Sequence, residues 1–255
     1  MKVAFLLYGQ PRDYLNSFKH INNFVQNQKG VHFDFFYHCW TIEKYQTYPH
    51  SPWRTIDKNT MNYSENVVEH LNQLYNPCAM SHEQQITDFP KSLYYDTIAY
   101  KEYTVNNPAL LKNINNTLSQ MYSRNKVRNL LYNHMKEHNS NYDFVIMTRF
   151  DYKYSPNINL NYLDTSTVYA ADTLYPRNLI PDTFIISPTN VFLDWFNIYD
   201  EIESVINNLN LMNTVLKFGE HISLNPEQLI FAKYILHNKN VDKVKYISSI
   251  KSGLI

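Results

Sequence analysis

The sequence predicts an α/β fold with a central, mostly parallel sheet flanked by helices, and three observations predict it. The run Val3–Tyr8 is apolar throughout, which is typical of a strand buried on both faces. Residues 13–25 follow with apolar side chains at helical spacing, and residues 32–40 form an aromatic, strand-like run. This β-α-β order favours parallel strands joined by crossover helices.

Later segments continue the alternation of helix and strand. Ser64 is placed to cap a helix that Pro77 ends, and Asn190 to cap a helix that reaches Ile206. A last helix begins at Asn225-Pro226-Glu227, where a cap residue precedes proline and an acidic first turn. The other expected elements are a short strand within 78–88, a long helix from Thr117, and strands at 142–148, 168–171 and 183–187.

The composition excludes several classes of protein. The chain has 255 residues, of which 44% are hydrophobic, so its apolar surface is sufficient to offset the entropy lost on ordering. Its 23 basic and 23 acidic side chains cancel, which argues against a nucleic-acid partner or a basic membrane-binding surface. No linker divides the chain cleanly, and we expect a single domain over 1–255.

Glycine and cysteine usage narrows the chemistry. Four glycines, at positions 9, 30, 219 and 253, cannot form either glycine-rich phosphate motif. A bound nucleotide would therefore need a metal ion or an arginine at its phosphates. The two cysteines, Cys39 and Cys78, form no C-x-x-C pair, so neither a disulfide framework nor a structural zinc is expected. The first apolar run is too short for a signal segment or a membrane span.

Two segments leave an apolar strand and become polar at once. They are residues 7–13, which contain Arg12 and Asp13, and residues 147–152, which contain Arg149 and Asp151. Ligands of open α/β sheets bind beyond the carboxyl ends of the strands. An arginine fork suits a diphosphate, and a carboxylate suits a divalent cation. The alternative is that each segment is only a surface ion pair or a turn.

Several segments, taken in chain order, resemble small glycosyltransferases of the GT-A type from large DNA viruses, phages and bacteria. The opening Val-Ala-Phe-Leu-Leu-Tyr-Gly-Gln-Pro-Arg and the later Asp143–Asp151 segment carry much of this resemblance. The remaining segments are 33–40, ending in His-Cys-Trp; 120–126, Gln-Met-Tyr-Ser-Arg-Asn-Lys; 181–187, Pro-Asp-Thr-Phe-Ile-Ile-Ser; and 226–229, Pro-Glu-Gln-Leu. The resemblance implies a Rossmann-like GT-A sheet. Because the first apolar run is short, we expect a cytoplasmic protein, in the host cytoplasm if the source is viral.

The same resemblance implies a nucleotide-diphosphate-sugar donor, a glycan or glycoprotein acceptor, and a divalent metal, Mn²⁺ or Mg²⁺. The metal motif of GT-A enzymes is Asp-x-Asp, whereas this chain has Arg149-Phe150-Asp151. Asp151 alone would then bind the metal, with diphosphate oxygens and waters completing its shell. Alternatively, Arg149 neutralises the diphosphate and the metal is dispensable.

We assign the catalytic roles to Asp182 and Asp151. Asp182 precedes an apolar strand and is the preferred base for an acceptor hydroxyl; Glu227 and Asp172 are the alternatives. The residues expected to bind the nucleotide-sugar are Tyr8, Gly9, Gln10, Arg12, Lys126 and Arg149.

Two other functions remain open. One is a non-catalytic glycan-binding module on the same fold, which the Arg-x-Asp departure favours. The other is a nucleotidyltransferase, against which the missing glycine-rich loop and the Gln-Pro-Arg opening argue.

Overall fold

The computed structural model describes residues 1–41, 66–86, 89–90, 114–151, 158–171, 180–216, 225–238 and 244–247 of the chain. Their centre is a seven-stranded sheet in the order β3-β2-β1-β4-β6-β5-β7. The strands are β1 (Lys2–Gly9), β2 (His32–Thr41), β3 (Ala79–Gln84), β4 (Phe144–Arg149), β5 (Val168–Ala171), β6 (Phe184–Pro188) and β7 (Val244–Ile247).

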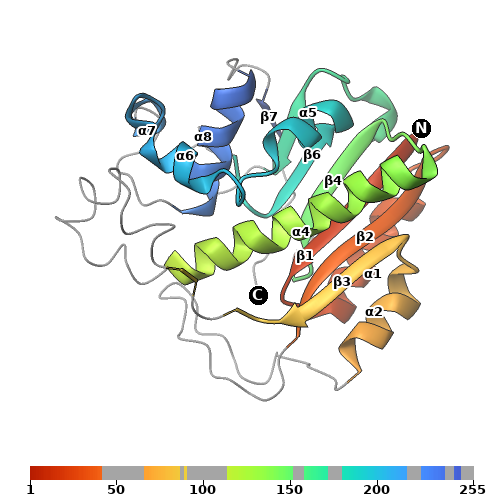
Figure 1. Ribbon diagram of the computed structural model, residues 1–255. Helices are drawn as coiled ribbons and strands as arrows, with labels where there is room; N and C mark the ends of the chain where they lie inside the picture. Colours follow the sequence, from red (N-terminus) through yellow and green to blue (C-terminus); the bar gives the residue numbers. More distant parts are fainter. Residues whose placement is uncertain are drawn as a thin grey trace.

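Strand direction confirms the predicted sheet. Strands β1 to β4 run parallel to one another, and β7 runs parallel to β5. β6 is antiparallel to both of its neighbours, β4 and β5, so it is the one reversed strand of the described sheet. The protein is therefore an α/β protein with a mostly parallel sheet flanked by helices (Figure 1).

The helices cover both faces of this sheet (Figure 1). Alternate residues of β1 divide between two cores: Ala4 and Leu6 pack in the core of α4, α5 and α8, while Val3 and Phe5 pack in the core of α1 and α2. The helices are α1 (Tyr14–Gln26), α2 (Val67–Tyr75), α4 (Ile114–His138), α5 (Thr189–Trp195), α6 (Ile202–Asn207), α7 (Leu209–Leu216) and α8 (Pro226–Asn238), with a 3₁₀ turn at Leu160–Tyr162.

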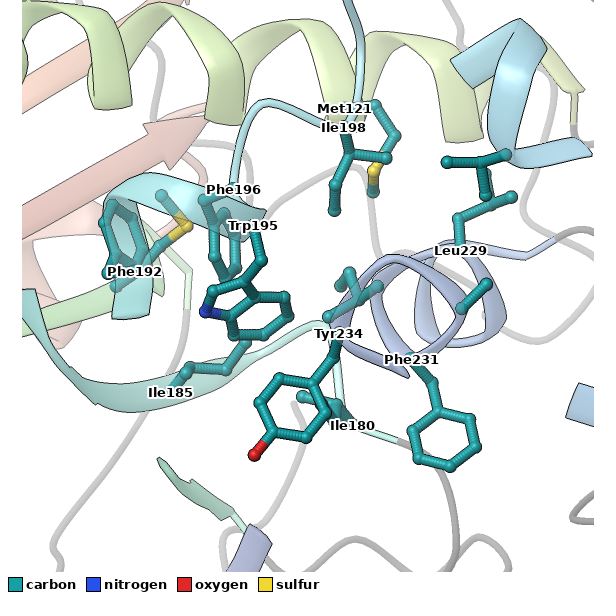
Figure 2. Close-up of a cluster of buried hydrophobic side chains, with 14 of the residues drawn as sticks. Met121, Ile180, Ile185, Phe192, Trp195, Phe196, Ile198, Leu229, Phe231 and Tyr234 are labelled. Atoms are coloured by element: carbon teal, nitrogen blue, oxygen red, sulfur yellow. The ribbon is translucent and has the colours of Figure 1, made fainter. Parts of the chain in front are cut away.

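A cluster of buried aromatic side chains fixes α8 to the sheet. Figure 2 shows Trp195 of α5 beside Ile185 of β6 and Tyr234 of α8. The rings of Trp195 and Tyr234 meet edge to face, with centroids 5.1 Å apart, and Trp195 is fully buried. This packing holds the first turn of α8, which carries Glu227, against the end of the sheet.

One helix differs from its prediction. Asn190 does not cap a helix reaching Ile206; it lies inside α5, which ends at Trp195, and a separate helix, α6, begins at Ile202. The chain turns between them because both short helices pack against α8, which one straight helix does not allow. Helix α7 and strand β7 were not predicted, and Ser64 lies outside the described residues.

The long helix α4 begins three residues before the predicted Thr117 and crosses the sheet (Figure 1). Val127 and Leu131 of its predicted apolar stripe are fully buried. Within the ranges given above, no helix combines the length and the apolar character that crossing a membrane requires.

Candidate functional site at the carboxyl edge of the sheet

The two polar strand ends singled out in the sequence are neighbours. β1 and β4 are adjacent parallel strands, and Tyr8 is the register partner of Arg149. β6 runs in the opposite direction, so its start, Phe184, lies opposite Thr148 near the end of β4. Asp182 lies two residues before that start and therefore reaches the same edge of the sheet.

Arg149 and Asp151 form a two-bond ion pair at this edge. Arg149 Nε and Nη2 donate to the two carboxylate oxygens of Asp151 at 2.8 and 2.7 Å. Arg149 Nη1 also lies 3.7 Å from Asp182 Oδ2, and Arg12 Nε lies 4.0 Å from Asp151 Oδ2. Burial opposes the charged form of Arg149, but Asp151 and Asp182 outweigh it, so the pKa of Arg149 is raised above its ordinary value.

These contacts bear on the predicted metal site. Both carboxylate oxygens of Asp151 receive hydrogen bonds from Arg149, and each oxygen keeps a second lone pair. Within the described residues, the metal-compatible group of side chains lies elsewhere, at Asp34, Cys78 and His134. The divalent metal at Asp151 therefore stays a prediction, and the positive charge that the structure places beside Asp151 comes from arginine.

Asp182 and Glu227 form a pair of carboxyl groups on the other side of Arg149. Glu227 stands in the first turn of α8, which Asn225 caps by accepting the Gln228 N–H at 2.9 Å. Burial, followed by the charge of Asp182, raises the pKa of Glu227 to about 8, and the two side chains share a hydrogen bond. At neutral pH Glu227 therefore carries a proton that Asp182 can accept in a hydrogen bond.

A buried arginine holds Asp182 in place. Arg124, which is 1% exposed, donates from Nη2 to the hydroxyl of Tyr8 and to the backbone oxygen of Asp182. The Tyr8 hydroxyl donates to the same backbone oxygen, and the Arg124 guanidinium lies 4.5 Å from the centre of the Tyr8 ring. Burial is the main cause that raises the pKa of Tyr8 to about 12.

This arrangement gives Tyr8 a position in the core. Tyr8 was predicted to bind the nucleotide-sugar, but its side chain is only 1% exposed. Tyr8 instead joins Arg124 in positioning Asp182.

A second set of hydrogen bonds fixes the end of β1. The Gly9 N–H donates to Ser123 Oγ at 2.9 Å, and Ser123 Oγ lies 2.6 Å from His38 Nδ1. Because Ser123 accepts from Gly9, its hydroxyl hydrogen is available to Nδ1, which assigns the imidazole hydrogen to Nε2. His38 Nε2 then donates to Glu83 Oε1 at 3.0 Å. We call this chain from Gly9 to Glu83 the His38 relay.

The histidine side chain of the relay is uncharged at neutral pH. His38 is fully buried, and burial lowers its pKa to about 4, although Glu83 acts in the opposite direction. Gly9 has φ +93°, a left-handed conformation that favours glycine, so the relay holds a backbone that turns sharply. The turn leads directly into Gln10 and Arg12.

Lys126 and Gln10 lie beside the relay. Lys126 Nζ is 3.5 Å from Glu83 Oε1, with 43% of the lysine side chain exposed. Gln10 Nε2 donates to Gln85, just after the end of β3. These two predicted ligand residues therefore belong to the part of the edge formed by β2, β3 and α4.

Arg124, Glu83 and His38 were not among the site residues predicted from the sequence. Arg124 was detectable, because it falls three residues from both Met121 and Val127 on the buried stripe of α4, where an arginine needs a polar partner. Glu83 had no comparable signal, since its role depends on β3 pairing with β2. Asp172 lies outside the described residues.

Comparison with known proteins gives limited information. No protein-family model and no curated protein matches the chain. A similar solved structure is that of a proposed nucleotide-diphospho-sugar transferase from Desulfovibrio desulfuricans G20. It has 9% sequence identity and a TM-score of 0.35, and the match covers 97% of this chain and 79% of that one. A TM-score this low defines neither a fold family nor an activity.

Proposed function

We propose that this protein is a glycosyltransferase that moves a sugar from a nucleotide-diphosphate-sugar to a glycan or glycoprotein acceptor. The carrying observation is the position of Arg149, which is paired with Asp151 on one side and lies 3.7 Å from Asp182 on the other. A positive charge for a diphosphate thus adjoins a carboxylate able to accept a proton. The resemblance of the sequence segments to GT-A enzymes supports the same proposal, in which residues 1–255 form a single domain.

The diphosphate of the donor would lie against Arg12 and Arg149. Both side chains are partly exposed, 30% for Arg12 and 18% for Arg149. Each offers a planar fork suited to phosphate oxygens, and together they oppose the negative charge that grows on the leaving nucleoside diphosphate. This charge is larger in the transition state than in the bound donor, so the interaction accelerates the reaction.

The transfer needs one proton acceptor. The acceptor hydroxyl oxygen forms the new bond to the anomeric carbon, the bond from that carbon to the phosphate oxygen breaks, and the nucleoside diphosphate leaves with the electron pair. The hydroxyl proton goes to Asp182. Glu227 remains protonated beside it, which limits the negative charge of the carboxyl pair to one.

The first experiment is a thermal-shift screen of nucleotide-sugars, with Mn²⁺ and with EDTA, followed by an assay for released nucleoside diphosphate. A ligand that binds only the native state raises the melting temperature by mass action. We expect one donor to stabilise the protein in EDTA, since arginine supplies the charge at Asp151. Stabilisation that requires Mn²⁺ would mean that a metal ion on Asp151 binds the diphosphate. If no donor stabilises the protein, the proposal is contradicted.

The Arg149–Asp151 pair favours one second candidate, a glycan-binding module that has lost catalysis. In that case the ion pair would be a permanent structural contact. Glycan binding without turnover of any donor would support this candidate.

A further inference from the structure

A second group of polar side chains lies at the opposite edge of the sheet. It consists of Asp34, near the start of β2; Cys78, just before β3; and His134 of α4. One donor atom from each, the carboxylate oxygen, the thiol sulfur and an imidazole nitrogen, falls within 4.8 Å of the other two. The candidate active site uses none of these three residues.

We propose that Asp34, Cys78 and His134 bind a zinc ion. Zinc prefers thiolate, imidazole and carboxylate ligands in a tetrahedral shell, and three protein ligands leave the fourth position to water. Ligand atoms around such an ion stand about 3.5 Å apart, so modest side-chain rotation closes this group around the metal. The spacing of Cys39 and Cys78 argued against zinc, but the fold can bring the other two protein ligands to Cys78 from β2 and α4.

Neighbouring residues hold all three proposed ligands in place. The Cys78 N–H donates to the backbone oxygen of Phe35 at 2.8 Å, which fixes the chain at the thiol. The His134 ring packs edge to face on Phe36, with centroids 5.2 Å apart. The Tyr142 hydroxyl donates to Asp34 Oδ2 at 2.7 Å, and a hydrogen-bonded ligand of this kind is held in orientation for a metal. Cys78 is exposed, which gives the ion a path of entry.

Zinc binding releases one proton, from the Cys78 thiol, and displaces Lys2 from Asp34 without changing the charge of the lysine. Cys78 shares a hydrogen bond with Asp34, and Lys2 Nζ lies 2.9 Å from Asp34 Oδ2. The Cys78 sulfur loses its proton to solvent as its bond to zinc forms, and the ion then stands between thiolate and carboxylate. Lys2, whose side chain is 36% exposed, competes with the metal for Asp34.

The test is a titration of the untagged protein with Zn²⁺ against a chromophoric chelator, repeated with Co²⁺ as a spectroscopic substitute. We expect one ion per chain and a thiolate-to-cobalt charge-transfer band. Cys78→Ser should abolish the band, and both this variant and His134→Gln should weaken Zn²⁺ binding at least about tenfold. Lys2→Met should tighten it. His237→Gln, on the exposed end of α8, is the matched control and should bind as the wild type.

A second measurement does not depend on variants. The chain has two cysteines and Cys39 is fully buried, so alkylation of the native protein reports Cys78. Zn²⁺ should slow this alkylation at least about tenfold, since only the thiolate reacts and the metal occupies it. No Zn²⁺ bound with metal in excess, or unchanged affinity in Cys78→Ser, would overturn the proposal. Neither result depends on whether the protein is a glycosyltransferase.

Discussion

Arg149 donates two hydrogen bonds to Asp151, at 2.8 and 2.7 Å, across the single intervening residue Phe150. Phe150 is fully buried and its ring packs against Tyr37, so the two polar residues project from a fixed point just after β4. An arginine held in this way keeps its fork oriented, and less conformational entropy is lost when it binds an anion. The pair therefore fixes the orientation of the guanidinium group that the proposed function places at the diphosphate.

Replacing Arg149 with lysine should weaken donor binding. Lysine keeps the charge but cannot bridge both oxygens of Asp151 and still face a phosphate. The loss of about one charge-assisted hydrogen bond corresponds to roughly tenfold weaker binding. Isothermal titration with the donor found in the screen measures it. Arg128→Lys, on α4 with its Nη2 bonded to the Leu193 oxygen at 2.7 Å, is the control. Equal donor affinity in the two variants would contradict the assignment.

The buried Glu227 should make stability depend on pH. Its pKa in the folded protein is about 8, against an ordinary value of 4.5. Between these values the folded state retains a proton that the unfolded state releases, so stability falls as pH rises through this interval and is level above it. Glu227→Gln removes this loss. We therefore expect the melting temperature of the variant, relative to wild type, to increase from pH 4.5 to about 8.

Turnover provides the second measurement on this pair. Asp182→Asn should lower kcat with little change in donor affinity, because the amide cannot accept the hydroxyl proton. Glu227→Gln, which retains a hydrogen-bond donor, should keep more of the activity. Full activity in Asp182→Asn would mean that another residue is the base. If the difference in melting temperature between Glu227→Gln and wild type does not change with pH, Glu227 is ionised in the folded protein.

The strand pattern of the first half was predictable because burial on both faces leaves a continuous apolar run, as in Val3–Tyr8. The placement of Arg12 and Arg149 at one edge of the sheet also followed, since parallel strands bring their carboxyl ends to the same edge, whereas the pairing of β1 with β4 did not. The break between α5 and α6 did not follow, because the same apolar spacing fits one helix or two, and contact with α8 decides between them.

The supporting residues of the site were harder to infer. The roles of Arg124 and His38 depend on partners 58 and 85 positions away, at Asp182 and Ser123. Local sequence contains no information on such pairs. The Asp34–Cys78–His134 group was missed for the same reason, since its members are brought together only by the fold.

Removing the hydroxyl of Ser123 should disturb the end of β1. Ser123→Ala leaves the Gly9 N–H and His38 Nδ1 without their partner in the relay, at a cost of about 1–3 kcal/mol in the free energy of unfolding. Denaturant unfolding measures this cost, and donor titration should show weaker binding. Ser119→Ala, one turn earlier on α4 and also buried, is the matched control, because its Oγ accepts a weak 3.4 Å bond from Gln85 and takes no part in the His38 relay. Equal effects in both variants would exclude a special role for the relay.

Substituting two glycines with positive φ, one at the candidate site and one away from it, distinguishes an effect on donor binding from a general loss of stability. Gly9 has φ +93° and Gly30 φ +73°, and an added Cβ at either position meets no atom within 4 Å. Alanine should therefore destabilise the protein by about 1–2 kcal/mol at both positions, through backbone conformation alone. Only Gly9→Ala should also weaken donor binding, because Gly9 donates to Ser123 and begins the turn that carries Arg12. Unfolding and donor titration of the two variants decide the matter: if Gly30→Ala lowers donor affinity as much as Gly9→Ala does, the end of β1 is not part of the donor site.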